Sequence, residues 1–380
     1  MEQILLHKHI VFGGEHYNPL GVIRSLGEFG IKPVYIVMDS KLKFASKSKY
    51  IHKVHVVSSI EEGYKLLLDV YGNEKNKPFL YSTDDSFEGY IDERYDELKD
   101  RFYFFNAGKS GRVNEFMNKE AFGNLAVKHG LNFLKTWRVK VGVIPEDIEY
   151  PVITKAVDSK SFGWKSLVHI CKDQEELKDA FSKINATEIL LQKYIQKKNE
   201  YCLDGMSVNK GKNLYISIAS TYNYLLADSY SPYMTITNFN RNDILGGLKG
   251  MFEEIGFEGI YSVEFLVDSN DQLYFGEINF RNSTWSYAST RAGMNLPVLW
   301  AKGMIGEDYG DIKKIKEGFT AMVEFADFNN RVREQKLSFS KWYKDYKKAD
   351  CRFYVGKNDI KPMFGMIRPI LGMIYHIFVK

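Results

Sequence analysis

The chain has 380 residues, of which 44% are hydrophobic and 26% charged, and its formal net charge at neutral pH is +4. This length suffices for two or three domains with sizeable cores, and the composition is typical of a soluble globular protein. The net charge is too small over this length to indicate nucleic-acid binding by itself.

Cysteine usage and apolar runs indicate the compartment. Cys171, Cys202 and Cys351 are odd in number and have no metal-binding spacing, as expected in a reducing cytosol. The first residues lack the basic region of a secretory signal, and no run of about 18 apolar residues predicts a spanning helix. We therefore expect a cytoplasmic protein without a transmembrane segment.

The first part of the chain alternates predicted strands and helices, as in a parallel α/β layer. The predicted elements are a strand at 9–12, a helix at 19–29, strands at 32–37 and 52–57, a helix at 60–70 and a strand at 78–82. Segments 13–18 and 82–85 follow strands, and ligands of such sheets bind beyond the carboxyl ends of strands. They predict one edge of a substrate site that includes Asp84; the alternative is that Asp84 only caps the next helix.

A lysine-flanked loop lies between two predicted strands in the middle of the chain. The strand at 150–155 ends in Lys155, the loop SKSFGWK ends in Lys165, and a second strand is expected at 166–170. Loop amides and ammonium groups together suit a polyphosphate, and no Walker motif is present. The alternative is a surface turn that is rich in lysine.

Two neighbouring segments complete this region. A helix is predicted over 118–129, with Asn118 as its N-cap. The strand at 188–195 enters the polar connector QKKN, and another strand follows at 200–209. Such a connector offers backbone groups to an adenine edge while apolar side chains sandwich the ring. The alternative is a set of polar residues at a strand edge.

Two alternating strands at 261–267 and 272–279 flank the turn-forming segment DSND and predict a β-hairpin. Side chains alternate across a strand, so Glu277 and Asn279 share a face, and antiparallel pairing brings Glu264 beside them. Two carboxylates and an amide oxygen suit Mg²⁺, which binds oxygen ligands together with substrate phosphates. The alternative is a solvated outer face, which the apolar residues on either side of Asn279 disfavour.

The C-terminal part follows a helix that runs from Pro297 to about residue 304. A strand is predicted at 319–328, and the tail from 336 is basic and aromatic. The last stretch, 363–380, predicts an amphipathic helix that lies on a membrane surface or on a partner. A helix packed on its own domain is the favoured interpretation, because cationic residues in this stretch are few.

These motifs resemble those of one enzyme family. The segment EINFRNSTWSYASTRAGMNLP is similar to the metal-binding strand of ATP-grasp ligases, in which a form close to EINPR precedes an AGxNLP helix start. Phe280 replaces the usual proline, at a position that shapes the backbone and is not a ligand. The lysine-flanked loop resembles the family's phosphate-covering loop, with fewer glycines and with Phe162 and Trp164 added. The strand and connector from Gln192 to Glu200 resemble the family's QEYI motif, and the three motifs occur in the family's order.

The resemblance implies a role for each matching residue. The implied Mg²⁺ ligands are Glu264, Glu277 and Asn279, and Arg281 with Lys165 would stabilise the transferred phosphoryl group. The implied ATP contacts are Lys119, Lys155, Ser161, Lys165, Gln192, Lys193, Ile195 and Glu200. Gln192 is expected near the adenine amino group, Lys193 and Ile195 in backbone contact with the ring, and Glu200 on the ribose. Asp84 and Arg291 are substrate candidates; a structural role of Arg291 at a helix start and a solvated Lys119 are the alternatives.

The implied fold combines α/β and α+β parts. An N-terminal parallel α/β domain is expected at 1–115, followed by ATP-grasp subdomains with the phosphate loop (116–200) and the metal-binding hairpin (201–310). The nucleotide is expected between these two α+β subdomains. Residues 311–380 are expected to form a C-terminal extension with a strand and a basic amphipathic helix.

Members of the family activate a carboxylate as an acyl phosphate and join it to an amine. The first hypothesis is therefore an ATP-dependent carboxylate–amine ligase similar to D-aspartate-ligase-like enzymes. The alternatives are a catalytically silent nucleotide-binding scaffold and an enzyme that makes a carboxy or carbamoyl phosphate, as carbamoyl-phosphate-synthase-like members do. The expected cofactors are ATP and Mg²⁺, for which Mn²⁺ can substitute. The expected partners are small-molecule carboxylates and amines and no nucleic acid; membrane contact by the C-terminal helix and a homodimer are left open.

Overall fold

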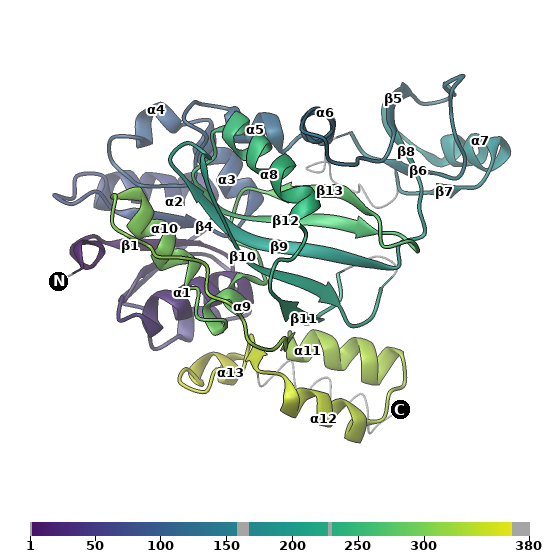
Figure 1. Ribbon diagram of the computed structural model, residues 1–380. Helices are drawn as coiled ribbons and strands as arrows, with labels where there is room; N and C mark the ends of the chain where they lie inside the picture. Colours follow the sequence, from purple (N-terminus) through teal and green to yellow (C-terminus); the bar gives the residue numbers. More distant parts are fainter. Residues whose placement is uncertain (1, 158–166, 227–229, 367–380) are drawn as a thin grey trace.

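The computed structural model describes residues 2–157, 167–226 and 230–366 and folds them around three β-sheets (Figure 1). A seven-stranded sheet lies between an N-terminal parallel layer and a small antiparallel sheet. The mixed α/β and α+β architecture confirms the predicted fold class.

The N-terminal layer is a parallel sheet in the order β3-β2-β1-β4, as predicted. Its central strands are buried because α1 covers one face and α2 and α3 cover the other. The elements are η1 (Gln3–Leu6), β1 (His9–Gly13), α1 (Tyr17–Glu28), β2 (Val34–Met38), η2 (Ala45–Lys47), β3 (Lys53–Val57), α2 (Ile60–Leu66), the π-helical turn η3 (Leu67–Tyr71), β4 (Phe79–Ser82), α3 (Asp85–Asp92), α4 (Tyr95–Leu98) and α5 (Arg112–Phe116).

The small sheet is antiparallel in the order β5-β8-β6-β7 and packs on α7 (Gln174–Lys183). Its strands are β5 (Thr136–Lys140), β6 (Val152–Lys155), β7 (Ile170–Cys171) and β8 (Glu188–Lys193), and α6 (Lys119–Lys128) precedes them. The strand predicted at 166–170 is wrong in extent, since pairing in the described residues covers only β7. Thr154 instead bonds the carbonyls of Leu167 and His169 through its hydroxyl and its backbone N–H, at 2.6 and 2.9 Å.

The seven-stranded sheet has the order β13-β12-β9-β10-β11-β14-β15. It contains the predicted hairpin, formed by β12 (Gly259–Val267) and β13 (Leu273–Asn279) around a five-residue turn. The other elements are β9 (Asn199–Val208), β10 (Asn213–Tyr222), β11 (Tyr233–Thr237), α8 (Asn242–Ile255), α9 (Ser286–Arg291), α10 (Leu296–Met304), β14 (Phe319–Met322) and β15 (Cys351–Arg352).

The strand predicted at 319–328 is also wrong in extent, because the chain turns into the helix α11 (Glu324–Phe328) after β14. A helical turn places Glu324 and Asp327 on one face, whereas a strand would send them to opposite faces. Both carboxylates are buried and bonded: Glu324 accepts the N–H groups of residues 353–355, and Asp327 accepts the Trp342 indole N–H at 2.8 Å. These bonds favour the helix.

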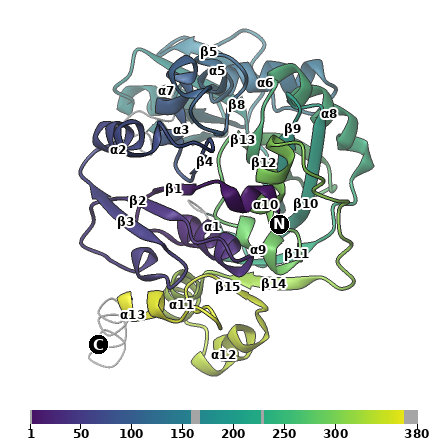
Figure 2. The same cartoon turned by 90° about the vertical axis from the view of Figure 1, so that its left-hand side faces the viewer.

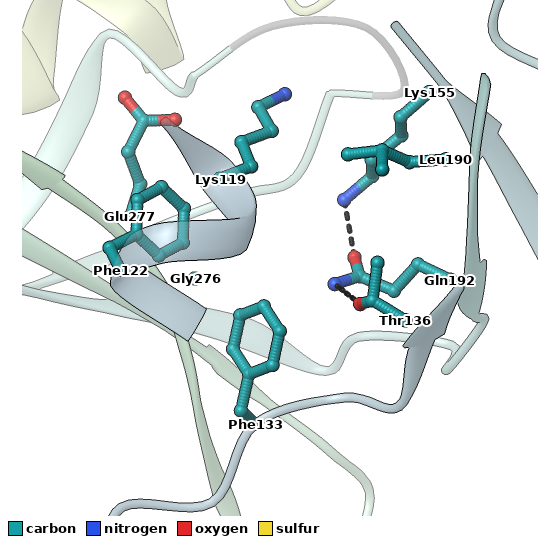
Figure 3. Close-up of a pocket in the computed structure, with 9 residues that line it drawn as sticks. All are labelled: Lys119, Phe122, Phe133, Thr136, Lys155, Leu190, Gln192, Gly276 and Glu277. Atoms are coloured by element: carbon teal, nitrogen blue, oxygen red, sulfur yellow. Dashed lines mark hydrogen bonds between the residues drawn. The ribbon is translucent and has the colours of Figure 1, made fainter. Parts of the chain in front are cut away.

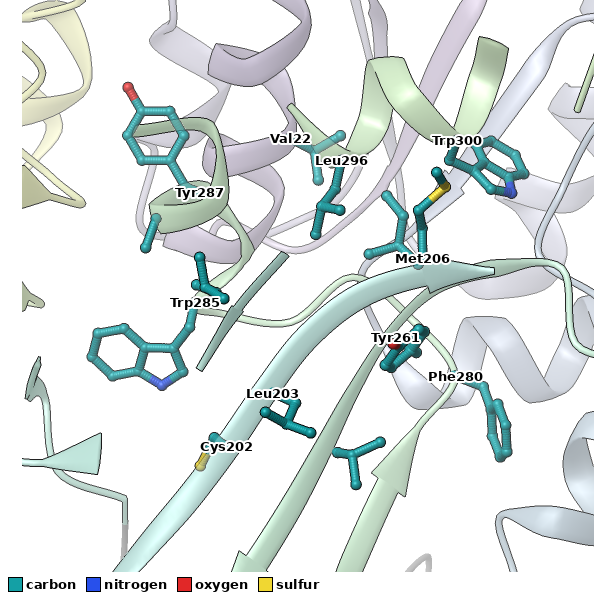
Figure 4. Close-up of a cluster of buried hydrophobic side chains, with 14 of the residues drawn as sticks. Val22, Cys202, Leu203, Met206, Tyr261, Phe280, Trp285, Tyr287, Leu296 and Trp300 are labelled. Atoms are coloured by element: carbon teal, nitrogen blue, oxygen red, sulfur yellow. The ribbon is translucent and has the colours of Figure 1, made fainter. Parts of the chain in front are cut away.

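One hydrophobic core joins the N-terminal layer to the seven-stranded sheet (Figure 4). Met206 on β9 lies beside Leu296 and Trp300 of α10, and Val22 of α1 packs into the same cluster. The core therefore holds the carboxyl ends of β1 and β4 close to the segment that follows the hairpin.

The described chain ends in a lobe at one end of the molecule (Figures 1 and 2). Its elements are α11, the π-helical segment η5 (Asn329–Glu334), α12 (Phe339–Lys348) and α13 (Lys361–Gly365), and β14 and β15 tie it to the large sheet. Most of the helix predicted at 363–380 lies outside the described residues, and the domain boundaries stay a prediction. Within the described residues, no helix has the length and apolar character needed to cross a membrane.

Candidate functional site

The hairpin brings the predicted acidic residues together. Glu264 on β12 lies directly opposite Glu277 on β13, and Asn279 lies opposite Ser262. A register shift follows Glu264, where Gly276 has no partner, so the two carboxylates lie at a local irregularity of the pairing. Asn279 is buried, and its Oδ1 accepts a hydrogen bond from Arg281 Nη2 at 3.1 Å.

The electrostatics of this pair suit a cation. Burial and the neighbouring carboxylate of Glu277 raise the pKa of Glu264. No group of three or more His, Cys, Asp or Glu side chains placed to hold a metal occurs in the described part of the chain. A hard cation here would therefore need the Asn279 oxygen and phosphate oxygens besides the two carboxylates, which is the donor set that Mg²⁺ prefers. The residues fit the ion, and its binding stays a prediction.

A pocket between the small sheet, α6 and β13 contains both signs of charge (Figure 3). Together with its open mouth it encloses about 390 Å³, and the lining residues are Lys119, Phe122, Phe133, Thr136, Lys155, Leu190, Gln192, Gly276 and Glu277. Lys155 Nζ donates to Gln192 Oε1 at 2.6 Å, and Gln192 Nε2 donates to Thr136 Oγ1 at 2.9 Å. Desolvation and the positive charge of Lys119 lower the pKa of Lys155 to about 8, so an anion in the pocket would stabilise its charged form.

The connector between β8 and β9 lies next to this pocket in the chain. The Lys193 N–H already donates to the Lys135 carbonyl at 2.8 Å, so an adenine contact through the backbone of Lys193 would use its C=O. Ile195 is half-buried in the connector. Glu200 is largely buried and forms an ion pair with Lys197. The nucleotide roles of these residues stay predictions.

Arg281 links the hairpin to the N-terminal layer. Its Nε lies 3.1 Å from Asp85 Oδ1, while its Nη2 donates to Asn279. The next residue, Asn282, donates its backbone N–H to the Ser82 carbonyl at 3.1 Å. Asn18 Nδ2 donates to the carbonyls of Asn282 and Thr83 at 2.8 and 3.1 Å. The two strand ends predicted to form one edge therefore meet at Arg281.

Gly13 shows how tightly this edge is packed. A Cβ at Gly13 would lie 2.2 Å from Thr83 Oγ1, so only glycine fits where β1 meets the turn after β4.

Other predicted site residues lie outside these clusters. Asp84 caps α3 and accepts the N–H groups of Ser86 and Phe87 at 2.9 and 3.1 Å. Arg291 is exposed at the end of α9 and is not among the residues that line the pocket. Ser161 and Lys165 lie outside the described residues.

The structure adds three residues that the sequence did not single out. Asp85, next to the predicted Asp84, is the one that pairs with Arg281. His16 caps α1, and desolvation and the charge of Arg281 lower its pKa to about 4, which keeps the ring neutral. Asp204 is buried on β9 and accepts hydrogen bonds from the hydroxyls of Ser283 and Ser286. An Asp within the buried alternation of β9 was the available signal for Asp204.

Comparison with known families agrees with this geometry. Residues 124–309 match the family described as the carbamoyl-phosphate synthase L chain, ATP binding domain. The match includes the small sheet, the connector and the hairpin, and therefore all the described candidate nucleotide and metal residues except Lys119.

Solved structures share the fold at low identity. An L-amino acid ligase from Bacillus licheniformis superposes with a TM-score of 0.64 at 13% identity, covering 83% of this chain and 80% of that one. The N5-carboxyaminoimidazole synthetase from Staphylococcus aureus gives 0.67 at 16% identity, covering 88% and 86%. The biotin carboxylase domain of Hydrogenobacter thermophilus 2-oxoglutarate carboxylase, in complex with MgADP, ADP and bicarbonate, gives 0.59 at 18% identity, covering 82% and 71%. At these identities the likeness concerns the fold.

Proposed function

Because this chain belongs to the ATP-grasp superfamily, we propose that it is an ATP-dependent ligase that joins a carboxylate to an amine. The carboxylate would attack the γ-phosphate of ATP, giving an acyl phosphate and releasing ADP. An amine, in our proposal that of an amino acid or an amino-acid-containing intermediate, would then displace phosphate. No protein nucleophile is needed for either step.

The observation that carries this proposal is the pocket whose lining combines Lys119 and Lys155 with Glu277 (Figure 3). The lysines suit the phosphates of a nucleotide, and Glu277 with its partner Glu264 suits the metal that accompanies them. Mg²⁺, when bound, would neutralise charge on the phosphates. Mn²⁺ is expected to replace it, since it accepts the same oxygen ligands.

The chain's own residues would divide the remaining work. Lys155 and Lys119 would offset charge on the transferred group, and Gln192 would hold Lys155 in place. Arg281, between Asn279 and Asp85, would orient the carboxylate where the hairpin meets the N-terminal layer. The acceptor side would then lie along the edge formed by the ends of β1 and β4.

A nucleotide thermal shift is the first test. Mg·ATP should raise the melting temperature of the wild type, and Mn·ATP should do the same, because a ligand that binds only the folded state stabilises it. Lys155→Ala should abolish most of the shift, whereas Lys183→Ala, at an exposed lysine of α7 paired with Asp179, should retain it. The absence of a shift with any nucleotide would contradict the proposal.

ADP release tests the reaction itself. Pairs of amino acids are supplied with ATP and Mg²⁺, and bicarbonate is supplied alone in a parallel series. We expect turnover that requires both a carboxylate and an amine and that falls by about a hundredfold or more in Glu277→Gln. Turnover with bicarbonate alone would favour the carboxy-phosphate alternative. Turnover that is unchanged in Glu277→Gln would contradict both the ligase proposal and this alternative.

A further inference from the structure

The end of the molecule away from the nucleotide pocket carries an excess of positive charge. The basic segment, defined here as residues 329–366, contains ten Lys or Arg and four Asp or Glu, a net charge of +6 against +4 for the whole chain. Two of the four acids are internally paired: Asp345 with Arg331 at 2.7 Å and Asp359 with Arg24 at 3.1 Å. The charge that reaches the surface is therefore largely that of lysine.

Seven lysines of the basic segment are exposed, while only two of its acids, Glu334 and Asp350, are exposed. The exposed lysines are Lys336, Lys341, Lys344, Lys347, Lys348, Lys357 and Lys361. Figures 1 and 2 both place the helices of this segment at the opposite end of the molecule from the small sheet that lines the pocket. A ligand bound there would leave the pocket open.

Exposed rings accompany this charge. Phe339 and Tyr343 on α12 are 57% and 41% exposed, and their rings stack at 5.8 Å between centroids. Ile360 and Phe364, at and within α13, are each 51% exposed. Within the described residues, the exposed phenylalanines are Phe339 and Phe364, and both lie in the basic segment.

The helical geometry of α12 separates three faces. At about 100° per residue, Trp342 and Tyr346 point into the lobe, Phe339 and Tyr343 form an adjoining stripe, and the lysines occupy the remaining face. Lys347 Nζ lies 5.0 Å from the Tyr343 ring, at the border between stripe and lysines. A ring stripe flanked by lysines is the pattern of a helix that lies in the interface of an anionic bilayer.

We propose that α12, together with the exposed face around α13, docks this protein on a membrane surface that contains anionic phospholipids. The rings enter the boundary between headgroups and acyl chains, and the lysines contact the headgroup phosphates. A second copy of the chain is a poor occupant, because a symmetric contact would place the lysines of α12 against each other. Docking here keeps the nucleotide pocket facing away from the bilayer.

Vesicle co-sedimentation with the full chain tests this proposal. We expect binding to phosphatidylcholine vesicles that contain phosphatidylglycerol, weakening as salt is added, and no binding to pure phosphatidylcholine. Lys341→Glu with Lys344→Glu should weaken binding by about tenfold or more, since each basic residue near an anionic leaflet contributes roughly a fivefold factor. Phe339→Ser with Tyr343→Ser should weaken it by about tenfold at the same charge.

A matched control is Lys172→Glu with Lys178→Glu, which reverses two exposed lysines in and next to α7 on the small sheet. This variant should bind vesicles like the wild type. Each variant is first checked for the wild-type melting temperature; if the ring variant fails this check, the solvated lysine pair still decides the outcome. The proposal is overturned if the wild type does not bind anionic vesicles, or if the control variant loses as much binding as the Lys341→Glu, Lys344→Glu variant. It is also overturned if duplex DNA competes fully while the ring variant binds normally, because the surface would then be a general polyanion site.

Discussion

Arg24 and Asp359 form a buried ion pair whose charged atoms have partners, whereas Glu264 and Glu277 bring two carboxylates together. Both members of the first pair are at most 2% exposed. Arg24 donates to Asp359 and to the carbonyls of Phe353 and Tyr354, at 2.6 to 3.1 Å. The Asp359 carboxylate also accepts hydrogen bonds from the hydroxyl of Ser48 and the backbone N–H of Lys49.

The acidic pair of the hairpin is compensated less, because burial and Glu277 raise the pKa of Glu264 by more than the charge of Arg281 lowers it. Within the described residues, neither Glu264 nor Glu277 forms an ion pair, although the two face each other in register. A buried charge is tolerated when it is paired and bonded, and it otherwise costs stability that a ligand can restore. The first cluster therefore holds the C-terminal segment on α1, whereas the second has the unpaired charge that our proposed cation site requires.

The largest expected effect on stability comes from breaking the Arg24–Asp359 ion pair. Arg24→Met leaves Asp359 buried without its partner and should lower the free energy of unfolding by about 3 to 5 kcal/mol. The urea midpoint, followed by circular dichroism, measures this loss. Arg138→Met is the matched control, because Arg138 pairs with Glu188 at the surface and such pairs contribute at most about 1 kcal/mol. Equal losses in the two variants would show that the Arg24 network is not structural.

Asp204 lies close to the acidic pair on the same sheet. Removing its charge should raise the stability of the protein, whereas removing the charge of Arg24 lowers it. Burial raises its pKa from 3.8 to about 6, so the folded state binds more protons than the unfolded state between these values. Stability should therefore fall as pH rises from about 4 to 6, by up to about 3 kcal/mol, and stay low at neutral pH.

Asp204→Asn keeps an acceptor for Ser283 and Ser286 but removes the charge. It should raise the urea midpoint at neutral pH and remove this part of the pH profile, leaving stability at acid pH nearly unchanged. If the variant is less stable than the wild type at neutral pH, the hydrogen bonds of the ionised Asp204 carboxylate outweigh the cost of burying its charge, and the prediction is wrong.

The sequence predicts the local features of both regions better than their assembly. The hairpin follows from alternation around a polar turn, and the Asn118 cap of α6 follows from its residue type; both are confirmed. The strand predicted at 319–328 is wrong beyond Met322, because a short apolar run does not separate a strand from a buried helical turn. The helix is selected by buried bonds from Glu324 to residues 353–355, which no local pattern records.

The same limit applies to the site. Glu264, Glu277 and Lys155 are found because the motifs place them, and the pairing of the first two is confirmed. Asp85 pairs with Arg281 across 196 residues of sequence, and its neighbour Asp84 had the stronger local signal as a helix cap. Contacts between the N-terminal layer and the hairpin depend on how the layers pack, and a single sequence contains no direct record of that packing.

A smaller effect is expected for the acidic pair itself. Glu264→Gln removes one of two facing carboxylates and should raise the free energy of unfolding without metal and nucleotide by about 1 to 2 kcal/mol, since one pKa unit corresponds to about 1.4 kcal/mol. The same variant should lose the stabilisation that we expect Mg·ATP to give the wild type. Glu253→Gln, at an exposed position on α8, is the control and should change neither quantity. If Glu264→Gln lowers the free energy of unfolding of the ligand-free protein, repulsion between Glu264 and Glu277 does not destabilise the fold, and the prediction is wrong.

The smallest expected effect comes from two helix caps that share one hydrogen-bond pattern but begin different helices, of which only α6 contributes lining residues to the pocket. Asn118 caps α6 by accepting the N–H groups of Glu120 and Ala121, and Asp173 caps α7 in the same way with Glu175 and Glu176. Replacement of either cap by alanine should cost about 1 kcal/mol of stability. Only Asn118→Ala should also weaken Mg·ATP binding, by a few-fold, because α6 begins with Lys119, which lines the pocket. Isothermal titration of both variants with Mg·ATP measures the difference in affinity. Equal affinities would show that Lys119 is a solvated lysine. Among the described lining residues, Lys155 would then be the lysine that contacts the nucleotide.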